Sequence, residues 1–241
     1  MDLFSMAAIA ALIMLAAFIQ GVLGFGFGMV SMATVPLLIG VKETVPVVAC
    51  VGLMLNVVLL VQLRDALALA QLRTMVAGGL LGIPLGVLFL QHANPQMLLG
   101  LLGGLLLGLA LWLGRRTALR QRSPWVGMLA GLCGGVLGGA FNTGGPPVIA
   151  YVSSHPWPPR QMRATLQAYF FLLSTVQLSL FAANGMLSTD NALHSLGLLI
   201  PLAVGALLGD HFSSRLPPER FRLLVRIGLA ILGIVMISRM F

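Results

Sequence analysis

Long apolar segments, separated by short polar or charged ones, follow one another along the whole chain. A helix that crosses a bilayer needs about 20 residues, and six segments approach that length between clear breaks. A transmembrane β-strand would instead show about 10 residues of alternating polarity, which these Leu-, Ala-, Gly- and Val-rich segments lack. The pattern therefore predicts an all-α polytopic membrane protein. The six predicted crossings are residues 45–63, 74–91, 97–114, 164–183, 192–209 and 221–238.

Two further apolar regions are interrupted by clusters of glycine. Residues 3–41 carry no charge over 39 positions and contain GVLGFGFG at 21–28. Residues 123–154 carry none over 32 positions and contain GVLGGAFNTGGPP at 135–147. Each region is long for one crossing and short for two, since two helices and a turn need roughly 40 residues or more. Each is therefore predicted to be a broken, re-entrant helical hairpin that returns to the side from which it entered.

The basic residues favour the same topology. If each Gly-split region crossed the membrane once, the 14 Lys and Arg residues would divide 7 against 7 between the two sides. If each region returns to its own side, 12 lie on one side and only Lys42 and Arg239 on the other. Short loops rich in Lys and Arg face the cytoplasm. The second arrangement is favoured, and it places both termini on the periplasmic or extracellular side.

The chain also repeats itself. GVLG at 21 recurs 114 residues later, and GIPLGVLFLQHANPQ (82–96) resembles GALLGDHFSSRLPPE (205–219) at an offset of 123. Each half is then a Gly-broken hairpin followed by three transmembrane helices, and three is an odd number, so the halves are predicted to be inverted repeats. Secondary transporters often use this plan, with the substrate at the midplane between the repeats. The predicted division is a first repeat at 1–114, a basic cytoplasmic linker at 115–124 and a second repeat at 125–241.

Composition supports the membrane class. Hydrophobic residues make up 59% of the chain and charged residues only 8%, with a mean hydropathy of +1.01, whereas a soluble domain has about 25% charged residues. The net charge of +8 does not indicate a nucleic-acid partner, because the basic residues lie between apolar segments, where they set topology. Cys50 and Cys133 lie inside apolar segments and are expected to be small buried hydrophobes. The N-terminal segment has no basic n-region and is interpreted as part of the mature chain.

The Gly clusters are the strongest candidates for chemistry. Irregular backbone inside a membrane is tolerated only where it is buried in protein or lines a watery cavity. A half-helix that starts after such a break points its free N–H groups and positive dipole end inward, which suits an anion. Asn142 and Thr143 add side-chain donors there, and Phe25 and Phe27 are candidates to line the cavity. The alternative is that the glycines only allow close helix packing, which explains GGLLGIPLG (78–86) and GLLGGLLLG (100–108) well.

Other polar residues lie within the apolar segments or near their ends. Single amides there serve either a substrate pathway or hydrogen bonds between helices, and Asn56 and Gln167 stand deepest. Arg163 either contacts an incoming anion or anchors its helix at the cytoplasmic interface. Asp210 and His211 are interpreted as interfacial. No HExxH, GxSxG or P-loop motif occurs, so neither an enzyme, nor a metal site, nor a cofactor is predicted. The remaining in-span amides are Gln20, Gln62 and Gln177.

At this point the chain resembles a known family. Two similar halves open with QGVLGFGFGMVSMATVPLLIG (20–40) and GGVLGGAFNTGGPPVIAYV (134–152), and RATLQAYFFL (163–172) follows in the second. This arrangement is similar to the TauE/SafE sulfite-exporter family of membrane permeases and covers nearly the whole chain. The resemblance implies transport of sulfur-containing anions such as sulfite, thiosulfate or sulfoacetate across a bacterial inner membrane. Matching its glycine-rich segments points to Gly24, Phe25, Gly26, Phe27 and Gly28, and to Gly138, Gly139, Phe141, Asn142, Thr143, Gly144 and Gly145.

The function predicted from the sequence is a secondary transporter of small sulfur-containing anions that works by alternating access, with export favoured. Its expected partners are a small anionic substrate and the lipid bilayer, with a homodimer left open. One alternative is a permease for another small carboxylate or amine. The other is a membrane scaffold subunit without transport. Asn56, Arg163 and Gln167 complete the predicted substrate contacts.

Overall fold

A computed structural model describes residues 3–113, 123–187, 195–213 and 218–238, and every regular element in these ranges is helical. The all-helical class predicted from the apolar segments is therefore confirmed. Of the predicted linker at 115–124, residues 115–122 lie outside the described residues. The elements are α1 (Leu3–Leu23), α2 (Phe27–Thr34), α3 (Pro36–Ile39), α4 (Val41–Leu63), the short 3-10 helix η1 (Arg64–Ala66), α5 (Leu69–His92), α6 (Pro95–Leu113), α7 (Pro124–Phe141), α8 (Gly145–Val152), α9 (Pro159–Ala183), α11 (Leu199–Ser213) and α12 (Pro218–Ser238).

Six helical stretches in the described residues are long and apolar enough to cross a membrane. Three of them correspond to the predicted crossings in α4, α5 and α9, and a fourth, Ser195–Phe212, overlaps the crossing predicted at 192–209. The other two lie in α1 and α7, the first arms of the Gly-split regions. The apolar stretches of α6 and α12 that could be searched, Pro95–Leu111 and Leu229–Ser238, are shorter. The multi-pass membrane class follows from these lengths.

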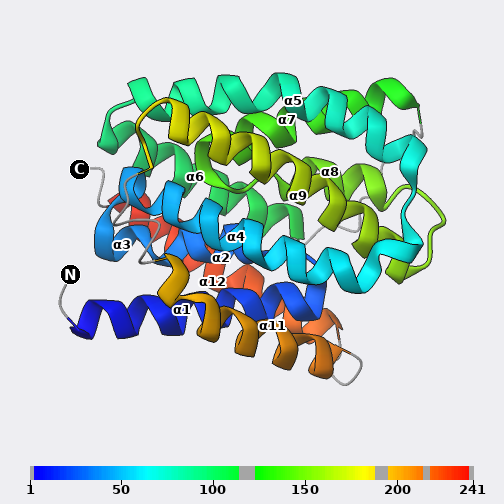
Figure 1. Cartoon of the computed structure of the whole chain (residues 1–241). Coiled ribbons are helices and arrows are strands. Elements are labelled where there is room, and N and C mark those ends of the chain that lie inside the picture. The colour runs from blue at the N-terminus through cyan, green and yellow to red at the C-terminus, as the bar shows by residue number, and fades with distance from the viewer. Residues whose placement is uncertain (1–2, 114–122, 188–194, 214–217, 239–241) are drawn as a thin grey trace.

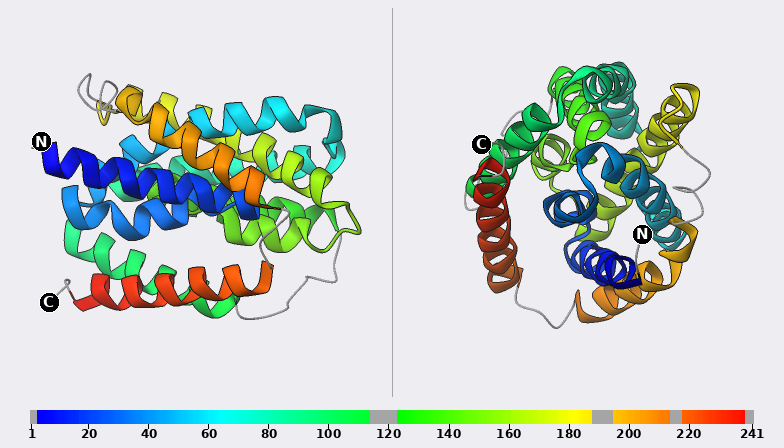
Figure 2. Two further views of the ribbon diagram at one scale, coloured as in Figure 1. Left: turned by 90° about the horizontal axis from the view of Figure 1, so that it is seen from below. Right: turned by 90° about the vertical axis from the view of Figure 1, so that its left-hand side faces the viewer.

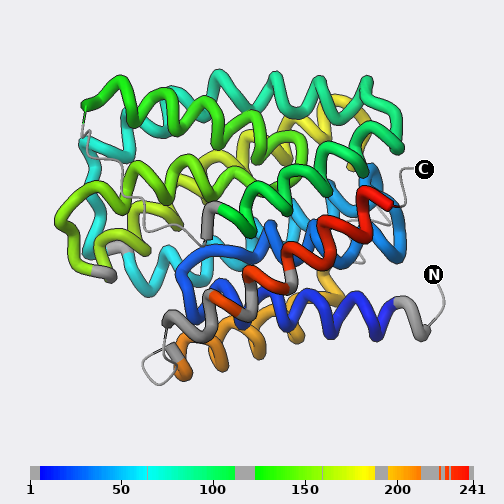
Figure 3. The backbone as a smooth tube through the Cα atoms, turned by 180° about the vertical axis from the view of Figure 1, so that it is seen from behind, coloured from blue at the N-terminus to red at the C-terminus, as the bar shows by residue number. Residues whose placement is uncertain are grey.

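Two pairs of long helices lie on opposite sides of the molecule, with other helices between them (Figure 1). In Figure 1, α5 and α7 lie along one side of the molecule and α1 and α11 along the other, with α2 and α4 between them, and the end-on view of Figure 2 shows the same separation. The most extensive contacts join α5 to α7, α1 to α11, α6 to α12 and α4 to α9. Seen from behind, α12 runs beside α6 (Figure 3). The two termini lie at the same end of the bundle (Figures 1 and 3).

Glycines bring the backbones of the two outer pairs into direct contact. A Cβ at Gly21 of α1 would lie 2.9 Å from the Cα of Gly209 in α11. On the other side, a Cβ at Gly139 of α7 would lie 3.2 Å from the Cα of Gly86 in α5. Small residues at such spacing let membrane helices approach closely. The packing interpretation of GGLLGIPLG is confirmed, since Gly78, Gly82 and Gly86 all face α7.

Outward-facing positions on these helices are large and apolar. Leu81 and Leu85 of α5, Ile200 of α11 and Ile231 of α12 are each more than half exposed. A water-soluble protein seldom exposes such continuous apolar surface, and lipid is its natural solvent. Several buried polar residues lie inside, where α1 and α7 end: Gln20, Asn56, Thr143, Gln167 and Gln177.

Candidate functional site

The first break in the backbone separates α1 from α2. Residues 24–26 are not helical, and Gly24 and Gly26 have φ angles of 79° and 116°. Only glycine adopts such values without strain. Gly26 is the N-cap of α2, and the amide of Phe27 donates to the Gln20 Oε1 atom at 3.0 Å. The remaining amides of the first turn of α2 have no carbonyl within the helix to which they can donate.

The second break separates α7 from α8 and has the same length. Asn142, the C-cap of α7, is in the left-handed region with φ 53°, a conformation that Asn tolerates better than most residues. Its Nδ2 atom donates to the carbonyl oxygen of Val45 at 2.8 Å, and the Gln177 Nε2 atom donates to its Oδ1 atom at 3.0 Å. Pro146 and Pro147 follow in the first turn of α8, where a missing N–H costs no helical hydrogen bond. The amides of Gly144 and Gly145 therefore remain available to a ligand.

The two breaks correspond to each other and touch. Four positions recur 118 residues later: the last residue of the long helix, the residue after it with positive φ, the N-cap and the first residue of the short helix. The N-caps differ in conformation, since Gly26 has a φ of 116° and Gly144 one of −67°. This correspondence differs by one helical turn from the GVLG match at 114. A Cβ at Gly28 would overlap the carbonyl oxygen of Asn142, so the breaks are in backbone contact.

A cavity of about 80 Å³ lies where the breaks meet. That is room for a few water molecules or one small anion. It is lined by both breaks, by the first turns of α2 and α8, and by inward faces of α1, α4, α5, α7 and α9. Ten of the predicted site residues line it: Phe25, Gly26, Phe27, Gly28, Asn56, Gly138, Asn142, Thr143, Gly144 and Gly145.

Five predicted site residues lie around the cavity without lining it. Gly24 accepts a hydrogen bond at its carbonyl from the Gln167 Nε2 atom at 3.0 Å. Gly139 packs against α5, and the Phe141 ring meets that of Phe89 edge-on, with 6.4 Å between the centroids. These four residues hold the breaks in place from outside. The fifth, Arg163, is described below.

An amide network joins the first break to α4 and α9. The Gln20 Nε2 atom lies 3.4 Å from both the Asn56 Oδ1 atom and the Gln167 Oε1 atom. The Asn56 Nδ2 atom lies 3.4 Å from the Ser174 Oγ atom. At these lengths the bonds are weak, so the donors can turn toward a ligand at small cost. All three amide residues are at least 95% buried.

Thr143 is the one buried hydroxyl of the cavity lining, in the described residues, that has no hydrogen-bond partner. It is 1% exposed and lies in the second break. An unpaired buried hydroxyl costs free energy. A ligand in the cavity would supply the missing partner. Its backbone amide is already used, since it donates to the carbonyl oxygen of Leu137 at 3.3 Å.

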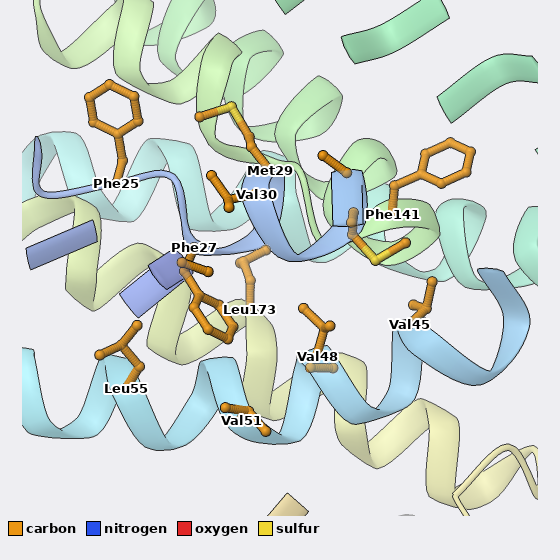
Figure 4. Close-up of a cluster of buried hydrophobic side chains, with 14 of the residues drawn as sticks. Phe25, Phe27, Met29, Val30, Val45, Val48, Val51, Leu55, Phe141 and Leu173 are labelled. Carbon is orange, nitrogen blue, oxygen red and sulfur yellow. The ribbon is translucent and has the colours of Figure 1, made fainter. Parts of the chain in front are cut away.

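Apolar side chains separate the polar groups from one another. In Figure 4 the Phe27 ring lies between the first break and α4, beside Leu173, while Phe25 points in another direction. Phe27 packs on α4 at Gly52, where a Cβ would lie 3.4 Å from the ring. Both phenyl rings are buried and line the cavity. The walls are therefore mixed, with donors at the breaks and hydrocarbon between them.

No residue that lines the cavity carries a formal charge, as far as the described residues extend. Arg163, predicted as a possible anion contact, lies one helical turn from Gln167 on α9. One guanidinium nitrogen lies 3.0 Å from the Asp210 Oδ1 atom and 3.2 Å from the carbonyl oxygen of Gly21. Arg163 thus ties α9 to α11 and to the end of α1. In the same described ranges no group of three His, Cys, Asp or Glu side chains is placed to hold a metal ion.

Some lining residues were not predicted from the sequence. Four lie on one face of α9, at the i, i+3, i+4 and i+7 spacing that marks a helix face. The sequence indicates Gln177 only as one of several amides that could line a pathway. In the structure its amide donates to the Gly138 carbonyl as well as to Asn142. The i+3 and i+4 pattern was visible in the sequence, but it indicates only a common face. The four residues are Phe170, Leu173, Ser174 and Gln177.

Comparison with known proteins confirms the family resemblance seen in the sequence. A model of the family described as "Sulfite exporter TauE/SafE" matches residues 9–236. The chain is 29% identical over 233 residues to a "Probable sulfite/organosulfonate exporter TauE" from Cupriavidus necator, with 89% of each chain covered. No solved structure matches.

Proposed function

We propose, because the chain belongs to the sulfite exporter TauE/SafE family, that it is a secondary transporter of small sulfur-containing oxyanions such as sulfite, thiosulfate or sulfoacetate. Its location would be a bacterial inner membrane, and export is the favoured direction, since a negative-inside potential drives anions outward. The observation that carries the proposal is a cavity lined by the first turns of both short helices, α2 and α8, and by the unpaired hydroxyl of Thr143.

The donors around the cavity suit an oxyanion. Amides of Gly28, Gly144 and Gly145 stand in the first turns of the half-helices, where the dipole favours negative charge. The Thr143 hydroxyl adds a donor, and the Asn56 and Gln20 amides can reorient toward the ligand. A carboxylate would fit the same donors, so a carboxylate permease remains the second candidate. An amine would meet the positive ends of both half-helices and is disfavoured.

The helix pairing supports the inverted-repeat arrangement. Exchanging α1 with α7 and α5 with α11 turns the α1–α11 pair into the α7–α5 pair. The same exchange leaves the pairs α4–α9 and α6–α12 unchanged if each consists of equivalent helices. This is the contact pattern of two repeats related by a two-fold axis. We therefore retain a repeat at 1–114 and a second at 125–241.

The same pairing defines which parts would move in alternating access. The closest backbone contacts, α5–α7 and α1–α11, each join one helix of the first repeat to one of the second. Rocking of one intact repeat against the other would break both contacts. We expect instead that α5 with α7 moves relative to α1 with α11, and that the cavity opens between their half-helices.

The topology can be tested by labelling. Gln96, in the first turn of α6, and Arg160, in the first turn of α9, are exposed side chains assigned to opposite sides of the membrane. In a background without Cys50 and Cys133, we expect a membrane-impermeant maleimide to label Gln96→Cys in intact cells and Arg160→Cys only after permeabilisation. Labelling of both residues in intact cells would contradict the arrangement with 12 basic residues on one side.

Transport by the proposed site is tested with Thr143→Val, which removes the hydroxyl and keeps the shape. We expect sulfite flux in proteoliposomes to fall about tenfold or more, because a hydrogen bond to a charged ligand contributes about 1.5–3 kcal/mol. Thermal stability should stay equal or rise, since the hydroxyl has no partner in the protein.

The matched control is Thr175→Val on the exposed face of α9, where the hydroxyl bonds only to the carbonyl of Phe171. It should transport as the parent does. Unchanged flux in Thr143→Val would show that the Thr143 hydroxyl does not contact the transported anion. Absence of flux for sulfite, thiosulfate and sulfoacetate in the parent protein would favour a scaffold role.

A further inference from the structure

We propose that Lys42 and Arg163 are equivalent gate residues that close the two ends of the transport pathway. The external gate is the contact of Lys42 with α5, and the cytoplasmic gate is the contact of Arg163 with α11 and α1. This inference rests on the proposed function, because it applies to a cavity that opens to each side in turn. It goes beyond that function by naming the contacts that must break before either side can open.

The cavity lining gives the register between α4 and α9. Four residues of α4 line the cavity, and each has a counterpart on α9, 121 positions later, that also lines it. At the same offset Lys42 corresponds to Arg163. Both cations stand six residues before these lining positions begin, about 9 Å along the helix axis at about 1.5 Å per residue. The four residues are Val48, Ala49, Gly52 and Asn56, and their counterparts are Tyr169, Phe170, Leu173 and Gln177.

The two cations stand at opposite ends of the cavity. In Figure 1, α4 and α9 lie side by side and run in opposite directions, so their first turns are at opposite ends of the bundle. The proposed topology places the start of α4 on the external side and the start of α9 on the cytoplasmic side. Each cation therefore lies between the cavity and one face of the membrane.

Each cation binds a helix end of the equivalent kind. The Lys42 Nζ atom donates to the carbonyl oxygen of Gln91, near the end of α5, at 3.2 Å. One Arg163 guanidinium nitrogen donates to the Asp210 Oδ1 atom, near the end of α11, at 3.0 Å. The same nitrogen donates to the carbonyl oxygen of Gly21, near the end of α1, at 3.2 Å. Since α5 and α11 are the helices exchanged between the proposed repeats, the two gates have equivalent partners.

The gates cross the boundary between the two helix pairs that are proposed to move. α4 also packs on α2 and α11, whereas α9 also packs on α5, α7 and α8. α4 therefore belongs with the α1–α11 pair and α9 with the α5–α7 pair. In the described residues, α5 is not among the helices that pack closely on α4, nor are α1 and α11 among those that pack closely on α9. Each gate thus joins its helix to the opposite pair where few other contacts do so.

A second hydrogen bond lies about one helical turn nearer the cavity on each side. On α4 the Val45 carbonyl oxygen accepts from the Asn142 Nδ2 atom, and on α9 the Gln167 Nε2 atom donates to the Gly24 carbonyl oxygen. These bonds tie each gate helix to a break, so movement at a gate reaches a half-helix. The buried Arg163 Nε atom has no partner, which lowers the free-energy cost of opening the cytoplasmic gate.

The test measures access to the cavity from each side of the membrane. With Cys50 and Cys133 replaced by alanine, Ser174→Cys supplies one thiol in the cavity lining. The rate of its modification by sulfonatoethyl methanethiosulfonate, an anionic and membrane-impermeant reagent, is measured in spheroplasts for the external side. Inside-out vesicles give the rate for the cytoplasmic side.

The matched variants are Lys42→Met and Arg163→Met, which remove one charge at equivalent positions and keep an unbranched apolar side chain. We expect Lys42→Met to raise the external rate at least about threefold and to lower the cytoplasmic rate, because opening to one side depletes the other open state. Arg163→Met should do the reverse. Asp210→Asn should act as Arg163→Met does, since it removes the other half of the ion pair. The control is Arg160→Met, an exposed position of the same helix, which should leave both rates unchanged.

The direction of the shifts decides the proposal. Rates that rise from both sides would indicate a loosened protein and would overturn it, as would shifts of the two Met variants toward the same side. A thiol that reacts from neither side in any variant would overturn it as well. Labelling does not require sulfite flux, so the two proposals can fail separately. Opposite shifts in a protein without sulfite flux would support the gates and contradict the proposed function.

Discussion

Replacing Gly28 by alanine should nearly abolish transport while leaving an inserted, helical protein. The added methyl group would overlap the carbonyl oxygen of Asn142 at the contact between the two breaks. Backbone cannot rotate aside as a side chain can, so the half-helices must separate. Overpacking of this kind costs about 1–3 kcal/mol, which corresponds to roughly 5- to 150-fold in the population of the closed site. Sulfite flux and thermal stability should both fall.

The control is Gly52→Ala, which also adds one methyl group to the cavity lining. That methyl would lie 3.4 Å from the Phe27 ring, an ordinary contact distance, so flux should stay within about twofold of the parent. If Gly28→Ala transports as well as Gly52→Ala, the two breaks are not in contact in the working protein.

Asn142→Asp should reduce sulfite flux at neutral pH by at least about 100-fold. The carboxyl group is nearly the same size as the amide and Asp also tolerates positive φ, so the break can keep its shape. The new carboxylate would face the anion, and two like charges about 4 Å apart repel by about 4 kcal/mol at an effective dielectric constant of about 20. It would also face the Val45 carbonyl oxygen, to which Asn142 now donates.

The variant Asn142→Gly distinguishes the effect of an added charge from the effect of losing the Asn142 side chain. Glycine accepts the φ of 53° without strain, but removes the hydrogen bonds to Val45 and Gln177. We expect this variant to keep more activity than Asn142→Asp at neutral pH. The ratio of Asp-variant flux to Gly-variant flux should rise as the pH falls, because protonation removes the added charge. Equal flux in the two variants at neutral pH would show that the anion does not approach position 142.

The helices were predictable because the membrane imposes a minimum length on each apolar segment. The two charge-free regions predicted at 3–41 and 123–154 each begin with a long helix, α1 (Leu3–Leu23) and α7 (Pro124–Phe141). The short helices α2 and α8 begin only a few residues after α1 and α7 end, at the N-caps Gly26 and Gly144. Glycine clusters inside charge-free segments therefore indicated where the chain breaks.

The register of the two breaks was not predictable from the same glycines. GVLG recurs at 114, but the equivalent residues at the breaks are 118 apart. Gly21 packs on Gly209, and both Gly135 and Gly139 pack on α5, at Gly79 and Gly86. A helix face with a glycine every four residues matches itself after a shift of one turn, so sequence similarity alone cannot choose between the two offsets.

The sequence identified the residues of the polar network only as separate candidates and not as a network. Gln20 and Gln167 are 147 residues apart, and no local spacing connects them. Arg163 was predicted either to contact an anion or to anchor its helix, and its partner Asp210 lies 47 residues further along the chain. Neutral amides and single ion pairs leave no periodic signal, because their positions depend on how distant helices pack. The position of the cavity was therefore predictable from the glycine breaks. The contacts among the polar side chains around it became visible only in the fold.

Backbone contact between α1 and α11 also sets an order of assembly during synthesis. Leu23 ends α1 and Leu199 begins α11, 176 residues later. At about 5–20 residues per second the ribosome needs roughly 10 to 35 seconds to cover that distance. The chain between α5 and α7 is far shorter, so that side of the molecule can close early. Throughout that interval the Gly21 face of α1 has no permanent partner. The first helix to be synthesised therefore gains its packing partner only when α11, one of the last helices, is made.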